Sequence, residues 1–476
     1  MSPRDPAYPV LSSVSTSGPS VQAAGSRPLV IFCVVALALL MSSLDQTIVA
    51  TALHALQHDL SAPLTWTSWT ITAYALGMVI MVPIAGKLSE QYGRRRIFVG
   101  SVVLFTAASL CCGFADNIYV LVALRFVQAL GGAGFTPSAT GIIVEHFGAV
   151  RDKAVGLFGS IFSIGAMIGP IFGGLFITWW SWRGIFFVNV PIGIALVVLS
   201  LRFIPCDPKR VHRASKNFDL IGMSALGVGV LAVMLALNAL AKGVDALLRP
   251  EFLIPALLAL LTLGFFVRHI RRSYHPFIPV AFIAGHGFGA VNLINVVGGM
   301  IEEGLVALVP LYAITRYGLS PLGAGLLLTA EGAAIILMSG LGVLMLRKSG
   351  YRLPIYIGVG AMAVGVAALA FVPRGISPYA WLTGVTCLIG LGAGLISPAS
   401  RNAGLQLAPQ HSPTLAALRT MSFQIGAIAA ISITAAAIAG AAHPGLVHAV
   451  VYIGWAVLFL LLLPITHLIP EHRGAW

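Results

Sequence analysis

The decapeptide GAMIGPIFGG, residues 165–174, lies inside a long apolar stretch that is otherwise typical of a single helix. In water each interior glycine costs a helix about 1 kcal/mol and a proline about 3 kcal/mol. Gly165, Gly169 and Gly173 recur every four residues, so they form a smooth stripe on one helix face. In a bilayer, helices associate through close van der Waals contact, which small residues allow. The stretch therefore indicates a membrane-spanning helix that packs tightly against a neighbour.

The composition of the whole chain agrees with a lipid environment. Of the 476 residues, 58% are hydrophobic and only 9% are charged, whereas soluble domains carry about 25% charged residues. Stretches of about 20 apolar residues can cross the hydrocarbon core, and we count fourteen of them. They lie near residues 28–54, 66–86, 97–115, 118–144, 154–178, 184–204, 218–241, 251–270, 284–314, 321–346, 354–373, 378–402, 414–441 and 446–469. The sequence therefore predicts an all-α polytopic membrane protein.

Basic residues fix the expected orientation of these spans. Lys and Arg gather in every second loop, and we assign Arg94, Arg151, Arg401 and Arg419 to such loops. Positive loops face the cytoplasm, and an even number of spans puts both termini on that side of the cytoplasmic membrane. The net charge of +13 is explained by this topology, so it gives no reason to expect a nucleic-acid partner.

A short internal repeat suggests two related halves. GAGFTPSA (132–139) has a counterpart in GAGLISPAS (392–400), and repeats of this kind are typical of transporters with a substrate site between the halves. Ser, Pro and Gly dominate the first 27 residues, as in disordered segments, and a full-length span follows without a cleavage signal. We predict a disordered cytoplasmic tail at 1–27, a six-helix half at 28–204, loops with an inserted helix pair at 205–277, a second six-helix half at 278–470 and a cytoplasmic tail at 471–476.

The loop GKLSEQYGRRR (86–96) resembles the loop motif of the major facilitator superfamily. Gly86 and Gly93 permit a tight turn, while Glu90 stands where the family usually has Asp. The resemblance implies a charge relay, with Arg94 among its members, that locks helix ends in one state. For the arginines alone, a cytoplasmic anchor is the simpler interpretation.

Two further stretches resemble family motifs and place opposite charges at similar depth. LRFVQALGGAG (124–134) resembles the motif around a buried arginine, with Arg125 and Gln128 matching, and LDQTIVATALH (44–54) resembles a motif of the drug:proton antiporters, with Asp45 matching. At 1.5 Å per residue, Asp45 and Arg125 lie about 14 Å and about 10 Å from the outer ends of their helices. A charge in mid-membrane is expensive and usually functional. We expect the two to share one polar network, which protonation of Asp45 would loosen; the alternative is an arginine that reaches the interface.

The opening decapeptide matches the helix 5 motif of the antiporters, with Pro170 and Gly174 in register. The resemblance implies an exporter in which the other half slides against the glycine stripe; generic helix packing is the simpler alternative. WRGIFFVNVPIG (182–193) is similar to the helix 5–6 junction of the fourteen-helix drug:proton antiporter branch. The resemblance implies the major facilitator fold, with two six-helix halves and an inserted pair.

Three acids lie within apolar spans of the second half. Glu302 and Glu303 are near the middle of one expected helix, and Glu331 is in the next. Intramembrane carboxylates usually mark ion or substrate pathways, so all three are candidates for proton coupling. Neighbouring helical residues point about 100° apart, so Glu302 and Glu303 cannot face one cavity equally, and a hydrogen bond between helices is the alternative for one of them. Our candidates for the substrate cavity are Gln128, Glu331 and Glu302.

The spacing of polar residues predicts no catalytic site and no metal site, so we expect neither enzyme activity nor a cofactor. Five cysteines, an odd number, imply no disulfide framework. The expected energy source is a proton gradient. We predict a monomer that exports amphipathic drugs or toxic compounds, with cations as one option, in exchange for protons. An exporter of a lipid or an endogenous metabolite is the first alternative, and a non-transporting sensor or partner subunit is the remote one.

Overall fold

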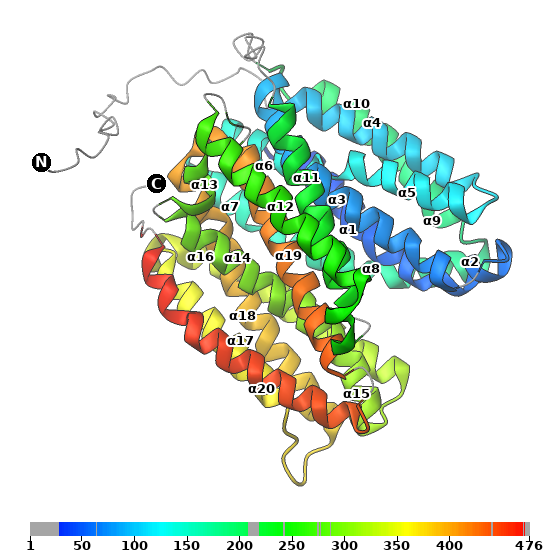
Figure 1. Cartoon of the computed structure of the whole chain (residues 1–476). Coiled ribbons are helices and arrows are strands. Elements are labelled where there is room, and N and C mark those ends of the chain that lie inside the picture. The colour runs from blue at the N-terminus through cyan, green and yellow to red at the C-terminus, as the bar shows by residue number, and fades with distance from the viewer. Residues whose placement is uncertain are drawn as a thin grey trace, which may run out of the picture.

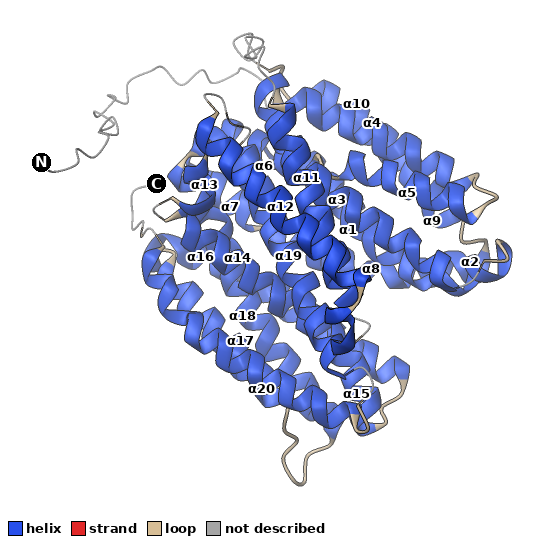
Figure 2. Ribbon diagram, viewed as in Figure 1, coloured by secondary structure: helices blue, strands red, loops and turns tan. Residues whose placement is uncertain are grey.

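The computed structural model describes residues 28–62, 64–207, 219–240, 243–273, 276, 278–285, 287–438, 441–469 and 471. The tail predicted at 1–27 lies outside them, and so does the tail predicted at 471–476 except for Glu471. Among the described residues, 14 helical stretches are long and apolar enough to span a membrane, which confirms the predicted number. Helices account for nearly all of the regular structure that Figure 2 shows.

Six spans precede residue 204. Their elements are α1 (Pro28–Thr51), α2 (Leu53–Asp59), α3 (Leu64–Tyr92), α4 (Arg94–Gly113), α5 (Ile118–Gly132), α6 (Phe135–His146), η1 (Gly148–Val150), α7 (Arg151–Gly156), α8 (Phe158–Trp179), α9 (Gly184–Phe187) and α10 (Asn189–Phe203). Asn117 caps α5, since its side chain accepts a hydrogen bond from the Tyr119 backbone N–H. The pairs α5–α6, α7–α8 and α9–α10 each form one span with a local break.

Eight spans follow. Their elements are α11 (Leu220–Leu240), η3 (Val244–Leu248), α12 (Pro250–Arg272), α13 (Val280–Ala284), α14 (Phe288–Gly299), η4 (Met300–Leu305), η5 (Val306–Leu308), α15 (Val309–Tyr317), α16 (Pro321–Ser349), α17 (Arg352–Leu369), α18 (Pro378–Leu407), η6 (Pro409–His411), α19 (Ser412–Ile438), α20 (Pro444–Leu462) and η7 (Leu463–Leu468). Ser320 and Ser377 cap α16 and α18, each followed by proline at the first helical position. The chain thus uses standard start signals at the expected helix ends.

The helices pack into two groups (Figure 1). One buried apolar cluster joins α1, α3, α4, α6 and α10 and extends to α11, α12, the end of α18 and the start of α19, and a second joins α14 to α18 with α20. Helix α11 packs against α12 and also contacts α3 and α19. In the most apolar stretch of α12, only 11% of the residues are buried inside the protein. We refer to residues 28–203 as the N-half and residues 288–468 as the C-half. The domain limits given above stay a prediction.

The two halves meet at one end of the bundle. Hydrogen bonds between them join Arg151 to Gln406 and Glu90 to the Thr414 backbone. We call this the basic end, because Arg94 and Arg151 lie there. Toward the opposite end, Ile171 and Phe172 on α8 are exposed. The halves are therefore joined at the basic end, while part of α8 is uncovered further along.

Candidate functional site

An ion pair is buried inside the N-half. Arg125 Nη1 on α5 lies 2.6 Å from Asp45 Oδ2 on α1, and each residue is only 1% exposed. The contact expected from the matching depths of the two residues is present. Opposite charges attract strongly in a low-dielectric interior, so the pair links two helices that are far apart in sequence.

Polar side chains from further helices complete the network around this pair. Gln128 Nε2 and Asn189 Nδ2 donate to Asp45 Oδ1 at 2.9 and 3.1 Å, and both also donate to Ser109 Oγ. Gln128 Oε1 accepts from Arg125 at 2.7 Å. Both Asp45 oxygens therefore have partners, and the carboxylate is closed off from water.

The prediction for Gln128 is wrong in one respect. Its side chain is 0% exposed and bonded within the network, so it does not line the substrate cavity as expected. Conversely, sequence analysis missed Ser109 and Asn189. Asn189 lies within the quoted stretch 182–193, and a lone amide in an apolar helix was the signal available.

Helix α3 covers the other side of Arg125. The Arg125 Nε donates to the Thr70 backbone carbonyl at 3.2 Å, and the guanidinium carbon lies 4.2 Å from the centre of the Tyr74 ring. Cation–π contacts gain strength when they are desolvated. The network thus ties together α1, α3, α4, α5 and α10.

The family's loop motif forms a clasp between the halves at the basic end. Glu90 Oε1 accepts the Thr414 backbone N–H at 3.1 Å in the first turn of α19, where a helix favours negative charge. A Cβ on Gly86 would lie 2.7 Å from the Ala417 Cβ and 2.8 Å from the Pro413 carbonyl, so only glycine lets α19 approach this closely. Glu90 also lies 3.3 Å from His411 Nδ1.

The arginines of the motif bond within the N-half and to the segment that directly follows it. Arg94 Nη1 pairs with Glu145 at 2.7 Å, and the backbone N–H groups of Arg95 and Arg96 donate to the Asp207 carboxylate at 3.1 Å. Gly93 has φ +105°, a conformation that favours glycine. Glu90 is therefore the member of the motif that reaches across to the C-half.

A second clasp joins α7 to α18 at the same end. Asn402 Nδ2 donates to the Asp152 carbonyl at 2.9 Å, and Gln406 Nε2 donates to the Asp152 carboxylate at 3.3 Å. A Cβ on Gly156 would lie 2.6 Å from Val343. The two clasps hold the basic end closed.

The glycine stripe has a different partner from the expected one. Added Cβ atoms on Gly165, Gly169 and Gly173 would overlap with Ser43, Thr47 and Thr51 of α1, respectively. The stripe therefore packs within the N-half and not against the C-half. The physical reason is that residues at every fourth position on α1 are themselves small, so the two helices fit together closely. Contacts from α8 to α16 of the C-half are also present.

Gly174 and Pro170 complete the quoted motif. A Cβ on Gly174 would meet nothing within 4 Å, so this glycine lies outside the close contact with α1. Pro170 lies within the continuous helix α8.

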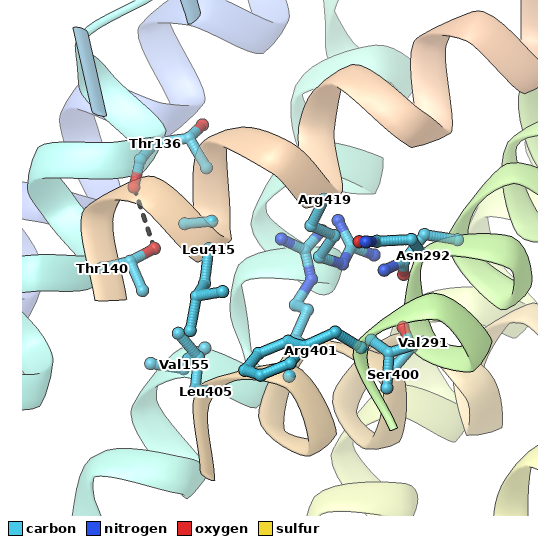
Figure 3. A pocket seen from close by; sticks show the side chains of 14 residues that line it. Thr136, Thr140, Val155, Val291, Asn292, Ser400, Arg401, Leu405, Leu415 and Arg419 are labelled. Atoms are coloured by element: carbon cyan, nitrogen blue, oxygen red, sulfur yellow. Dashed lines mark hydrogen bonds between the residues drawn. The ribbon is translucent and has the colours of Figure 1, made fainter. Parts of the chain in front are cut away.

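A cavity lies between the halves, and its empty space, open solvent included, is about 460 Å³ (Figure 3). The walls come from α6, α7, α14, α18 and α19. The lining residues are Thr136, Thr140, Val155, Phe288, Val291, Asn292, Asn295, Ser400, Arg401, Gly404, Leu405, Leu415, Ala416 and Arg419. Half of these fourteen residues are polar or charged and half are apolar; binding sites for small molecules likewise combine apolar walls with polar groups.

Arg401 and Arg419 point into this cavity from α18 and α19 (Figure 3). The prediction that they belong to cytoplasmic loops is therefore wrong. Arg401 is six residues, or about 9 Å, from the end of α18 at Leu407, and Arg419 is seven residues, or about 10 Å, from the start of α19 at Ser412. An arginine lowers the local hydropathy, so in the sequence it looks like the end of an apolar span. Here both helices continue past the arginine.

A smaller adjoining cavity contains Glu302. It shares Asn295, Ser400 and Arg419 with the larger one. Glu302 and Glu303 lie in a π-helical turn, η4, a distortion that is frequent at functional sites. The structure answers the question left open above: Glu302 lines a cavity.

The other two acids are placed differently. Glu303 is exposed, and Glu331 on α16 is only 7% exposed, with no partner for Oε1. Electrostatic interactions connect Glu331 with Glu302 and Glu303. Glu331 lines neither of these two cavities, and its assignment to the substrate cavity stays a prediction. Within the described residues, no three His, Cys, Asp or Glu side chains come together as they would to bind a metal ion.

Comparison with known proteins agrees with this architecture. The chain is similar to the multidrug transporter protein MdtP of Bacillus subtilis, with 32% identity over 76% of this chain and 66% of the relative. It is 30% identical to a multidrug resistance protein B homolog of Mycobacterium tuberculosis, over 82% of this chain and 72% of the relative. A riboflavin transporter, RibZ, of Clostridioides difficile is 26% identical over 83% of this chain and 86% of its own length.

Solved structures share the fold at low sequence identity. The human organic anion transporter MFSD10 superposes with a TM-score of 0.65 at 14% identity, over 92% of this chain and 99% of that chain. The proton:xylose symporter XylE gives 0.63 at 15% identity, over 94% and 97% of the two chains. The family described as Major Facilitator Superfamily matches residues 35–431 and, in an overlapping second match, 291–472. The chain therefore belongs to the major facilitator superfamily and is a membrane transporter with multidrug transporters among its relatives.

Proposed function

We propose that this transporter exports amphipathic compounds across the cytoplasmic membrane in exchange for protons. Two of the relatives named above are a multidrug transporter and a multidrug resistance protein, which supports drugs or other toxic compounds as cargo. The observation that carries the proposal is the buried carboxylate of Asp45, held by three donors from two other helices.

Asp45 is suited to couple protons to movement. A proton on its carboxylate removes the charge that holds Arg125 and weakens the bonds from Gln128 and Asn189, so α1 is released from α5 and α10. Because α1 packs on the glycine stripe of α8, and α8 contacts α16 of the C-half, a shift of α1 is passed to the other half. Proton exchange at this closed site itself requires such a shift.

The clasps at the basic end serve as the gate in this scheme. Opening the cavity at that end requires Glu90 to leave the Thr414 N–H and Asp152 to leave Gln406. With the basic end and both termini on the cytoplasmic side, cargo enters from the cytoplasm when these contacts break. Glu302 and Glu331 are the further candidates for proton binding in the C-half, Glu303 is the third, and the proton gradient is the energy source, without a cofactor. We propose a monomer as the functional unit.

A second candidate is export of an endogenous metabolite on the same fold. The riboflavin transporter among the relatives favours it. Both candidates share the coupling mechanism and differ in cargo.

Uptake into inverted membrane vesicles, whose cytoplasmic face is outward, tests the proposal. We expect uphill transport of ethidium, or of a fluorescent lipophilic acid, that a protonophore abolishes and that Asp45→Asn lacks. The control Asp245→Asn removes an exposed carboxylate in η3 and should transport like the wild type. Transport by Asp45→Asn at the wild-type rate, or transport indifferent to the protonophore, would contradict the proposal.

A further inference from the structure

Two positive charges of the C-half lie deep in the span without an acidic partner. Arg401 and Arg419 are partly accessible from the larger cavity. Within the described chain, neither guanidinium has an ion pair; Arg401 Nε donates only to Ser397 Oγ at 3.3 Å, and Arg419 Nε has no hydrogen bond. A charge in the span is costly, so two guanidinium groups without an ion pair at one cavity favour the binding of a counter-ion there.

A buried amide beside them is also without partners. Asn295 on α14 is only 2% exposed, lines both cavities, and has no hydrogen bond at either Nδ2 or Oδ1. Leaving a buried polar group without a hydrogen bond destabilises a protein. Its neighbour Asn292 is satisfied, since Nδ2 donates to the Phe282 and Ile283 carbonyls. Asn295 therefore has free hydrogen-bonding groups where a ligand could lie.

Positive and negative side chains line different parts of the two cavities. The larger cavity contains both arginines and no acid, whereas the smaller one contains Glu302 beyond Asn295 and Arg419. Glu302 and Glu303 interact electrostatically with both arginines but lie beyond ion-pair distance of 4 Å. The larger cavity thus presents positive charge within apolar walls that include Phe288, Leu405 and Leu415.

We propose that the cavity binds cargo that carries an oxyanion, such as a carboxylate, on an apolar body. Guanidinium groups match the geometry of carboxylate and phosphate oxygens and form charge-assisted hydrogen bonds with them. Arg401 and Arg419 would hold the oxyanion, the Asn295 amide would donate to it, and the apolar walls would cover the body. This assignment rests on the proposed export function and replaces the cationic option for cargo held in this cavity.

Equilibrium binding to the purified full-length protein tests the inference. The probes are a dansyl-labelled aliphatic carboxylate and its methyl ester, which share the same apolar body. We expect the wild type to bind the acid at least about tenfold more tightly than the ester, as a charge-assisted hydrogen bond implies. Arg401→Gln and Arg419→Gln should each remove this preference. Arg374→Gln, at an exposed position, should keep it.

A fold control and a second variant keep the test decisive. The thermal melting of each variant shows whether it is folded, and Asn295→Asp places a negative charge in the site without removing an arginine. We expect this variant to bind the acid at least about tenfold more weakly than the wild type does, with ester binding unchanged. Equal binding of acid and ester by the wild type, or an unchanged preference in folded arginine variants, would overturn the inference.

The same assay identifies the source of the oxyanion. The dansyl acid is then bound to the protein in nanodiscs that contain phosphatidylglycerol. If the lipid competes with the acid in the wild type and does not compete in Arg419→Gln, the site binds a lipid headgroup. Absence of competition would assign a free organic anion. Binding needs no gradient, so a failure of the proposed proton exchange, seen in vesicles with Asp45→Asn, stays distinct from a failure of this inference.

Discussion

Two buried asparagines show how the halves of this transporter differ. Asn189 in the N-half is 3% exposed and donates to both Asp45 and Ser109. Asn295 in the C-half is 2% exposed and has no partner at either amide atom. Two equally buried amides therefore differ in their hydrogen bonding: Asn189 completes a network, and Asn295 lines a cavity without a hydrogen-bond partner.

The charges around these asparagines follow the same division. Arg125 has Asp45, Gln128, a backbone carbonyl and an aromatic ring as partners, whereas Arg419 has an unbonded Nε and the Phe423 ring at 5.3 Å. A satisfied network rigidifies its helices, while an unsatisfied one is available to a ligand. We therefore assign coupling to the N-half network and cargo binding to the C-half cavity.

The largest expected effect comes from breaking the satisfied network. Asp45→Asn leaves Arg125 buried without a counter-charge, and removal of one partner of a buried pair costs about 3–5 kcal/mol. We expect a much lower melting temperature in detergent and loss of uphill efflux. In the double variant Asp45→Asn/Arg125→Gln, part of the stability should return. Additive effects of the two substitutions would show that the pair is not coupled.

The two asparagines provide the direct comparison. Asn189→Leu leaves Asp45 and Ser109 without one donor each and should destabilise the protein by about 1–3 kcal/mol. Asn295→Leu removes an amide that has no partners, so it should leave the melting temperature unchanged or raise it while weakening binding of an acidic cargo. Equal destabilisation by both substitutions would contradict the division between the halves.

Two glycines of α8 differ in the same way, because Gly169 packs closely against α1 and Gly174 has no neighbour within 4 Å of an added Cβ. In Gly169→Ala the new methyl group overlaps with Thr47, and in Gly174→Ala it meets nothing. Overpacking costs about 1–3 kcal/mol, so Gly169→Ala should lower the melting temperature. Gly174→Ala should raise it slightly, because alanine favours the helix. A reversed order of the two melting temperatures would argue against close packing of α1 on α8.

The smallest effect is expected at the clasp between the halves. Glu90→Gln keeps the size of the side chain but removes the charge near the start of α19, an interaction worth about 0.3–1 kcal/mol. We expect faster labelling of a single cysteine at position 415, in the cavity wall, from the basic side. Lys348→Gln, a substitution at an exposed position, serves as the control. Equal labelling rates in the two variants would show that Glu90 does not help to hold the basic end closed.

The sequence determined the features that depend on composition and on depth along a helix. The fourteen spans follow from apolar length, and the meeting of Asp45 with Arg125 follows from the fixed rise per residue together with the cost of leaving a buried charge unpaired. The glycine stripe also followed from spacing. Each of these features depends on the length of one helix, or on the position of a residue along its helix.

The tertiary structure decided which surfaces face each other. It placed α1 opposite the glycine stripe, brought Asn189 to both Asp45 and Ser109, and put Arg401 and Arg419 at a cavity instead of in loops. In a membrane helix the lipid-facing and protein-facing sides are both apolar, so hydropathy does not reveal which side is covered. Only the packed helices show whether a buried polar group has found a partner or still lacks one.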